Sequence, residues 1–361
     1  MIKSLKAIDL FCGAGGFSLG LKDAGFDVLV GIDKFDGPVK TYQHNFGVER
    51  GLQLDLSSIQ PHELKNKVKN VTRTKINDLD LIVGGPPCQG FSLASRRKDR
   101  GSKEDIRNDL SLKYFEFIRE INPKYFIFEN VAGLLSALDG EWFQLIEQKI
   151  HEISNYEFEY EIKDTADYGI PQHRKRLLIV GTRNDQEKPK KTKKSNLKVT
   201  VKNAISDLAT DIPDSKLDII HYETDPENDY QKEMRKYNKS LINHFLRKHT
   251  SEVQEFFMGV REGTSGKFKK RTHYKFNRND LAPTITGQPY YFIHYELPRV
   301  PTLRELARLQ SFPDTFEFKG TRTTGGHRRG LDVVQEQQVG NSVPPLMAKA
   351  VGLSINNILK N

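Results

Sequence analysis

Residues Asp9–Gly20 read DLFCGAGGFSLG, the pattern of a short strand, a glycine-rich turn and the start of a helix. The glycines at positions 13, 15 and 16 let the backbone approach a ligand at a distance where a Cβ atom would collide. The turn is not a dinucleotide fingerprint, because Ser18 occupies the third glycine position, and no G-K-[ST] follows. A pyrophosphate site is therefore disfavoured. The alternative is that the turn is only a tight connection.

Apolar runs around this turn alternate with helical periodicity through the first half of the chain. We expect strands at Ala7–Phe11, Asp27–Ile32, Leu79–Val83, Tyr125–Phe128, Glu157–Ile162 and Arg176–Val180. Between them we expect helices at Gly16–Ala24, Val39–Phe46, Leu110–Ile121 and Glu141–Glu152. Continuous runs such as YFIF and RLLIV are typical of strands covered on both faces. The pattern predicts an α/β fold with a doubly wound, mostly parallel sheet.

The character of the chain changes after Thr182. Residues 188–202 contain seven lysines, and the chain remains polar and irregular to about Pro298, so we expect a second, smaller domain there. Helical periodicity returns at Thr302–Gln310, and a closing helix is expected at Pro345–Leu359.

The composition limits the class of protein. Of 361 residues, 37% are hydrophobic and 29% are charged, which fits a globular enzyme. No stretch approaches the ~20 apolar residues of a membrane helix, and the first residues leave no room for a secretory signal, so we expect a cytoplasmic protein without membrane contacts. The net charge of +9 favours a polyanionic partner. The two cysteines, Cys12 and Cys88, lack metal-ligand spacing, and we expect neither a metal site nor a disulfide.

Two carboxylates follow the glycine turn in the order that a nucleoside site requires. Asp33 ends the second expected strand, where an acidic side chain can accept hydrogen bonds from both ribose hydroxyls. Asp55, in QLDLSS, can accept one from an adenine amino group. With the turn, they predict an adenosine-containing ligand that lacks a pyrophosphate.

Candidate functional residues also lie at the ends of three other expected strands. Gly84–Ser92 reads GGPPCQGFS, which holds Cys88 on a loop stiffened by two prolines. Glu129 ends the strand YFIFE, and Arg174 and Arg176 precede RLLIV. Ligands bind at the carboxyl ends of strands in open α/β sheets, so these side chains could converge on one small polar molecule. The alternative for Cys88 is a buried packing residue.

Six segments carry a specific resemblance. DLFCGAGGFSLG, GGPPCQGFS, FENV, YGIPQHRKR, RELARLQSFPD and QVGNSVPP resemble, in order, the motifs of the cytosine-C5 DNA methyltransferase family of the bacterial restriction-modification type. The resemblance covers about residues 5–183 and 301–358. It implies a methyltransferase fold with a discontinuous catalytic and cofactor-binding domain at 1–183 and 301–361, and a target-recognition domain at 184–300.

The resemblance implies the following chemistry. A thiolate at Cys88 attacks carbon 6 of cytosine, which makes carbon 5 nucleophilic enough to take a methyl group from S-adenosylmethionine, leaving S-adenosylhomocysteine. Loss of the carbon-5 proton and expulsion of the thiolate complete the reaction. Glu129 would hold and protonate ring nitrogen 3, and Arg176 would contact the cytosine O2. Arg174 would steady the loop or the DNA backbone.

The resemblance also implies binding positions for the cofactor. They are Phe11, Gly13, Gly15, Gly16, Asp33, Lys34, Asp55, Leu56, Pro86, Leu110, Asn341 and Ser342. One position departs from the family pattern: Lys34 stands where an aromatic side chain often stacks on adenine, so the stacking contact is left open, with Phe35 as one candidate.

The expected partner is double-stranded DNA. The target base must be flipped out of the stack, and the basic loop after Cys88 could close on the backbone, with contacts expected from Gln89, Ser92, Arg96 and Arg97. The stretch Lys267–Arg278 interleaves six basic residues with aromatic ones, and we expect DNA contacts from Lys269, Lys270 and Arg271. The lysine run KPKKTKK is read instead as a solvated face.

Two other functions remain as alternatives. A tRNA cytosine methyltransferase of the same family usually carries a Cys-Phe-Thr motif, which this chain lacks. A DNA-binding protein without activity would not need the set Cys88, Glu129 and Arg176. We expect a monomer, and the sequence leaves open whether a companion restriction endonuclease exists.

Overall fold

The computed structural model describes residues 4–73, 79–87, 110–210, 212, 219–236, 238, 240–288, 291–322 and 332–360. The chain divides into two compact units. Unit 1 comprises Met1–Asp164, Lys175–Lys193 and Ala348–Asn361, and unit 2 comprises Thr165–Arg174 and Lys194–Met347. None of the helices in the described ranges is both long enough and apolar enough to cross a membrane.

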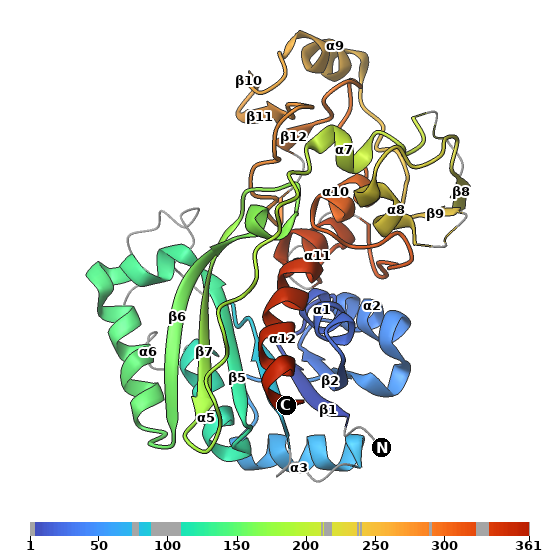
Figure 1. Ribbon diagram of the computed structural model, residues 1–361. Coiled ribbons are helices and arrows are strands. Elements are labelled where there is room, and N and C mark those ends of the chain that lie inside the picture. Colours follow the sequence, from blue (N-terminus) through green and yellow to red (C-terminus); the bar gives the residue numbers. More distant parts are fainter. Residues whose placement is uncertain are drawn as a thin grey trace. The chain divides into compact units, whose positions relative to one another are not determined.

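Unit 1 is built on a seven-stranded sheet with the order β3-β2-β1-β4-β5-β7-β6 (Figure 1). Its strands are β1 (Leu5–Leu10), β2 (Phe26–Asp33), β3 (Gly51–Gln53), β4 (Leu81–Gly84), β5 (Tyr125–Val131), β6 (Tyr156–Asp164) and β7 (Lys175–Arg183). Strand β7 is antiparallel to β5 and β6, whereas the pairs among β1 to β5 are parallel. The strand order reverses between β1 and β4, and ligands bind at the carboxyl ends of strands at such a switch point.

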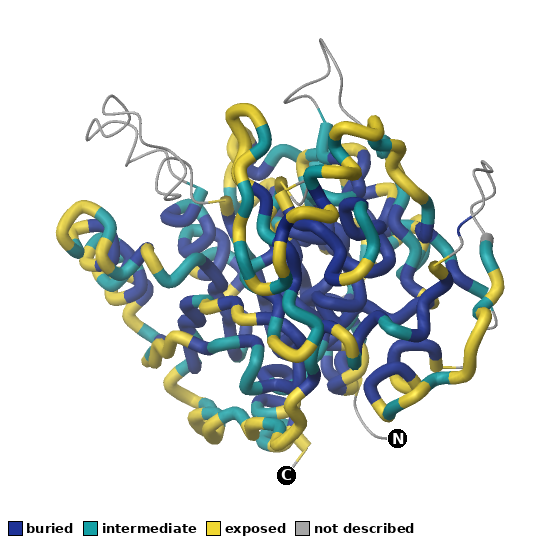
Figure 2. Tube along the Cα trace, turned by 90° about the horizontal axis from the view of Figure 1, so that it is seen from above, coloured by how far each residue is buried: buried dark blue, intermediate teal, exposed yellow. Residues whose placement is uncertain are grey.

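Helices cover both faces of this sheet. The helices of unit 1 are α1 (Gly16–Asp23), α2 (Asp36–Phe46), α3 (Pro61–Thr72), α5 (Leu110–Ile121), α6 (Glu141–His151) and α12 (Pro345–Leu359, in this unit from Ala348), with short 3-10 turns at Val48–Arg50 and Ala132–Gly140. Helices α3, α5 and α6 bury one core with the sheet, which includes Ile8, Phe126 and Ile179. On the other face, α12 packs against α1 where Gly352 meets Ala24. Figure 2 shows the resulting buried interior in dark blue.

The predicted α/β sheet is confirmed, with six strands and the main helices within a few residues of their expected bounds. Two elements were missed. Strand β3 has only three residues, and α3 is a mainly polar helix that buries only Leu64 and Val68. A capping box between Gln60 and Glu63, with Pro61 at the first helical position, was the signal that could have identified α3.

Unit 2 consists of short elements. They are a 3-10 turn (Thr165–Tyr168), α7 (Val201–Ile205), β8 (Ile219–His221), α8 (Asp229–Arg235), β9 (Ser240–Ile242), α9 (Ser251–Gly259), β10 (Ser265–Phe268), β11 (Arg271–Lys275), β12 (Phe292–Ile293), α10 (Leu303–Leu309) and α11 (Gln335–Asn341). Strands β8 and β9, which flank α8 in the sequence, form an antiparallel two-stranded sheet, and β10, β11 and β12 form a three-stranded sheet.

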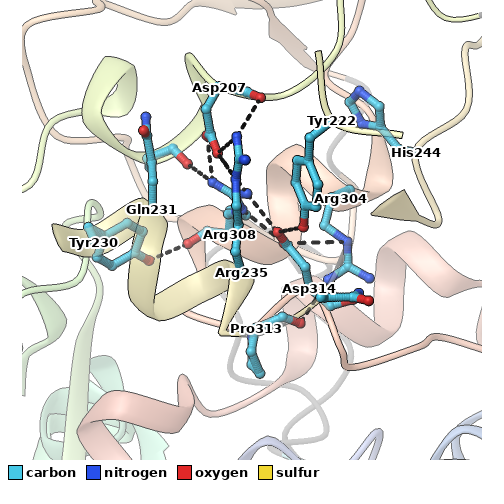
Figure 3. A network of polar contacts seen from close by, with 12 residues as sticks. Asp207, Tyr222, Tyr230, Gln231, Arg235, His244, Arg304, Arg308, Pro313 and Asp314 are labelled. Atoms are coloured by element: carbon cyan, nitrogen blue, oxygen red, sulfur yellow. Dashed lines mark hydrogen bonds and ion pairs between the residues drawn. The ribbon is translucent and has the colours of Figure 1, made fainter. Parts of the chain in front are cut away.

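A buried ionic network holds unit 2 together (Figure 3). The guanidinium of Arg308 lies between two carboxylates, with Nη1 2.7 Å from Asp207 Oδ1 and Nη2 2.6 Å from Asp314 Oδ2. Arg304 donates to the carbonyl oxygens of Ile242, Pro313 and Phe316. These bonds attach α10 to segments that lie up to 101 residues away in the sequence.

The two compact units do not coincide with the domain bounds expected from the sequence. Residues 301–347 fall in unit 2, because Arg304 and Arg308 bond to Ile242 and Asp207 of the same unit. Thr165–Arg174 also falls in unit 2, because buried Gln172 donates to Gln310 and accepts from the Ile285 amide. Sequence periodicity does not report such long-range polar contacts.

Candidate active site

The glycine turn connects β1 to α1 with an unusual backbone. Phe11, Gly13 and Gly15 have φ angles of 61°, 53° and 97°, and Gly15 is the N-terminal cap of α1. A Cβ atom on Gly15 would lie 2.5 Å from the Phe46 ring. Only glycine therefore fits at that position, because the turn packs directly against the Phe46 and Tyr42 rings of α2.

Asp33 fixes this turn from the end of β2. Its Oδ2 accepts the Gly13 amide at 3.0 Å, and its Oδ1 accepts the Phe35 amide at 3.0 Å. Burial raises the pKa of Asp33, against the opposing effect of these amide hydrogen bonds. Each carboxylate oxygen has a second lone pair, so the pair of acceptors expected for a ribose remains chemically available.

Lys34 and Asp55 form an ion pair beside Asp33. Lys34 Nζ lies 2.8 Å from Asp55 Oδ2, while Asp55 Oδ1 accepts from the amide and hydroxyl of Ser57. These bonds lower the pKa of Asp55 to about 2, with the Lys34 contact as the largest cause. Both Asp55 oxygens thus already have donors, and Lys34 contacts the carboxylate expected to accept from adenine.

The other cofactor positions expected in unit 1 lie around the same strand ends. Gly16 begins α1, Leu56 is buried after β3, and Leu110 begins α5. Pro86 is buried after β4, and its carbonyl accepts from Asn130 Nδ2 at 3.2 Å. Their contacts with a cofactor stay a prediction.

Glu129 and Arg176 form a largely buried ion pair at neighbouring strands of the sheet. Arg176 Nε lies 3.0 Å from Glu129 Oε1, and the two side chains are 13% and 11% exposed. Burial lowers the pKa of Arg176, and the Glu129 carboxylate opposes that shift. A Cβ atom on Gly85 would lie 2.9 Å from Glu129 Oε2, so the chain that leads to position 88 runs directly past the carboxylate.

A polar chain beneath the glycine turn was missed by the sequence reading. Buried Asp9 accepts from the Ser18 hydroxyl at 2.6 Å, and Ser18 lies 2.9 Å from the Tyr42 hydroxyl. Burial raises the pKa of Asp9 to about 7. The available signal was an acidic residue inside an otherwise apolar strand. These bonds tie β1, α1 and α2 together beneath the turn.

Several expected site residues belong to unit 2. Arg174 is buried and donates through Nη1 to the Ile285 carbonyl at 2.8 Å. Asn341 ends α11, and the Ser342 hydroxyl donates to the Gln338 carbonyl. Lys269, Lys270 and Arg271 are exposed at the turn between β10 and β11. Cys88, Gln89, Ser92, Arg96 and Arg97 lie outside the described residues.

Known proteins resemble this chain over nearly its whole length. The family model described as C-5 cytosine-specific DNA methylase matches residues 5–357. The chain is 34% identical to the type II methyltransferase M.DdeI of Desulfomicrobium norvegicum, over 99% of this chain and 90% of that protein. It is 31% identical to the type II methyltransferase M1.HphI of Haemophilus parahaemolyticus, over 98% and 87%.

The fold has a close counterpart among solved structures. An E. coli protein assigned as a DNA modification methyltransferase encoded within a prophage superposes with a TM-score of 0.80 and 26% identity, over 99% of this chain and 100% of that one. The resemblance of the six motifs is confirmed by the family match over nearly the whole length. The chain therefore belongs to the C-5 cytosine-specific DNA methylase family and is a DNA cytosine methyltransferase.

Proposed function

We propose that this protein transfers a methyl group from S-adenosylmethionine to carbon 5 of a cytosine flipped out of duplex DNA, through a covalent bond between Cys88 and carbon 6. Its biological role would be to protect host DNA in a restriction-modification system, as the type II relatives suggest. The protein would act in the cytoplasm as a monomer, with or without a companion endonuclease.

The buried pair of Glu129 and Arg176 is the observation that carries the proposal. When a thiolate adds to carbon 6, negative charge develops on ring nitrogen 3 and O2. A carboxyl group bonded to nitrogen 3 allows a proton to reside there, and a guanidinium next to it can stabilise charge on O2. Two such groups, 3.0 Å apart and beside the segment that leads to Cys88, match both requirements.

The glycine turn and Asp33 support the choice of cofactor. At Gly13 a Cβ atom would meet no protein atom within 4 Å, so the turn has open space beside its main chain, and Asp33 offers acceptors for two ribose hydroxyls. When bound there, S-adenosylmethionine would supply an electrophilic methyl group on its sulfonium. Asp9, Ser18 and Tyr42 would keep the turn in one conformation, which lowers the ordering cost of binding.

A first experiment measures transfer of labelled methyl groups from S-adenosylmethionine to duplex DNA. We expect incorporation with the wild-type protein, and none with Cys88→Ser, whose DNA binding should survive in a gel-shift assay. The same assay with tRNA tests the alternative substrate. Incorporation into tRNA alone, or into no nucleic acid, would overturn the proposal.

A second experiment tests the covalent step directly. Duplex DNA with 5-fluorocytosine at the target cannot lose the carbon-5 substituent, so the adduct should resist denaturation. We expect peptide mapping to locate the bound base at Cys88. An adduct at Cys12, the other cysteine of the chain, would show that the nucleophile was assigned wrongly.

A further inference from the structure

The hairpin formed by β10 and β11 has one covered face. The Phe268 ring lies 5.1 Å from the Phe256 ring of α9, and the His273 ring meets Phe257 edge-on at 5.5 Å. Between them, a Cβ atom on Gly266 would lie 2.7 Å from a methyl group of Val260, so α9 packs directly on the strand. The side of the hairpin that faces α9 is therefore covered; α9 lies next to β10 and β11 in Figure 1.

The opposite face of the hairpin is open. Opposed residues of an antiparallel pair share a face, and the pairs Lys267–Thr272 and Ser265–Tyr274 alternate with the covered pair Gly266–His273. Lys267, Thr272 and Ser265 are exposed, while Tyr274 is half-buried. Lys267 is the cation of this face, the turn beside it adds Lys269, Lys270 and Arg271, and no carboxylate lies between Ser265 and Lys275, so the hairpin suits a polyanion.

The turn of the hairpin carries a separate group of cations. Lys269 and Lys270 connect the strands, and Arg271 begins β11. Lys269 has a φ angle of 55°. Its Nζ lies 3.9 Å from Glu252, and because both side chains are largely exposed this ion pair is weak. These side chains lie beyond the end of the open face and do not extend from it.

We propose that the open face lies in the DNA major groove, where Lys267 and Thr272 read base edges, while the cations of the turn bind phosphates. The inference rests on the proposed function. Two strands about 4.8 Å apart fit a groove about 12 Å wide. Opposed Cβ atoms lie about 5 Å apart, so the two side chains reach neighbouring base pairs.

The chemistry of the two side chains predicts what they recognise. An ammonium group donates to O6 and N7 of guanine, and a threonine contacts the thymine methyl group or a base-edge acceptor. Lys267 therefore specifies a guanine in the target sequence, and Thr272 specifies the adjacent pair. Phosphate contacts position a protein on the duplex without distinguishing sequences.

The experiment first identifies the methylated sequence by bisulfite sequencing of DNA treated with the wild-type protein. Methylation rates are then measured on duplexes with each single base-pair change, across a range of salt concentrations. The variants are Lys267→Ala, Lys267→Arg and Thr272→Val, with Lys270→Ala as the matched loss of one positive charge from the same hairpin. Thermal unfolding checks that each variant folds.

We expect Lys267→Ala to lose about ten- to a hundred-fold of discrimination at one guanine-containing pair, and Lys267→Arg to retain it. Lys270→Ala should weaken binding to all sequences alike, with the salt slope reduced by about 1. If the enzyme methylates DNA but both Lys267→Ala and Thr272→Val discriminate between base pairs as the wild-type protein does, the inference is overturned. Absence of transfer by the wild-type protein would instead overturn the proposed function.

Discussion

Replacement of Arg308 by methionine tests how the ionic network of unit 2 contributes to stability. The guanidinium makes five hydrogen bonds: two to Asp207, two to Asp314 and one to the Ala204 carbonyl. The side chains of Arg308, Asp207 and Asp314 have no exposed surface. Methionine retains much of the length of the side chain but none of its donors.

The cost follows from the carboxylates that the substitution leaves behind. Asp207 would keep Arg235, whose Nε lies 2.7 Å from Oδ2, and Asp314 would keep the Tyr222 hydroxyl at 2.5 Å. Removal of one partner from a buried pair costs about 3–5 kcal/mol when the remaining charge is uncompensated. Arg235 stays beside Asp207 and Arg304 stays 3.9 Å from Asp314, which places the cost at the lower end of this range. We expect a loss in this range, which corresponds to a rise of at least about a hundred-fold in the open population of unit 2.

Hydrogen exchange measures this loss unit by unit. The only tryptophan, Trp142, lies in unit 1, so its fluorescence would not report on unit 2. Amides of α10 should exchange at least about a hundred times faster in Arg308→Met, whereas amides of α5 should not change. Lys232→Met is the matched control, since its pair with Asp229 is exposed and worth below about 0.5 kcal/mol. Equal effects of the two substitutions would refute the reasoning.

Three further predictions concern the site and pH. Glu129→Gln should reduce kcat by about a hundred-fold or more while DNA binding in a gel shift persists; normal turnover would exclude Glu129 from proton transfer. Gly15→Ala should weaken binding of S-adenosylhomocysteine in calorimetry, because the φ angle of 97° and the Phe46 ring oppose a Cβ atom; wild-type affinity would contradict this. Burial lowers the pKa of His294 to about 4, well below that of a histidine in the unfolded chain. As the pH falls from 7.5 to 5, the unfolded chain therefore takes up a proton that the folded chain does not, and the free energy of unfolding of unit 2 should decrease by about 2 kcal/mol. Hydrogen exchange at both pH values checks this, and His294→Asn should flatten the dependence.

The centre of the large sheet could be predicted because strands such as β4 and β5 are covered on both faces and are therefore mainly apolar. Runs such as Tyr125–Phe128 are buried in the structure as the pattern requires. Unit 2 has short strands and helices whose positions depend on buried polar contacts. Asp207 and Arg308 are 101 residues apart, and nothing in local periodicity connects them. The boundaries of unit 2 could therefore not be predicted from local sequence patterns.

The candidate site was predictable to a similar extent. The sequence predicted that Glu129 and Arg176 could converge; Arg176 begins its strand, and it reaches the carboxyl end of β5 because β7 runs antiparallel to β5, which brings the two side chains within 3.0 Å. The pairing of Lys34 with Asp55 could not be foreseen, because it depends on side-chain rotamers on two separate loops. The role of Asp9 as an acceptor for Ser18 became evident only from burial.

Recombination that exchanges target specificity between relatives would have to keep the ion pairs of Arg308 intact. A chimera joined at residues 184 and 300 takes Asp207 from one parent and Arg308 from the other. Unless the donor sequence supplies a carboxylate at the equivalent position, the guanidinium enters an apolar interior with one of its counter-ions missing. Crossover points at residues 194 and 347 keep both members of the pair in one parental segment, so hybrids joined there retain the ion pairs of Arg308 and need only a matching partner for Gln172, which bonds to Gln310 and Ile285 from outside that segment.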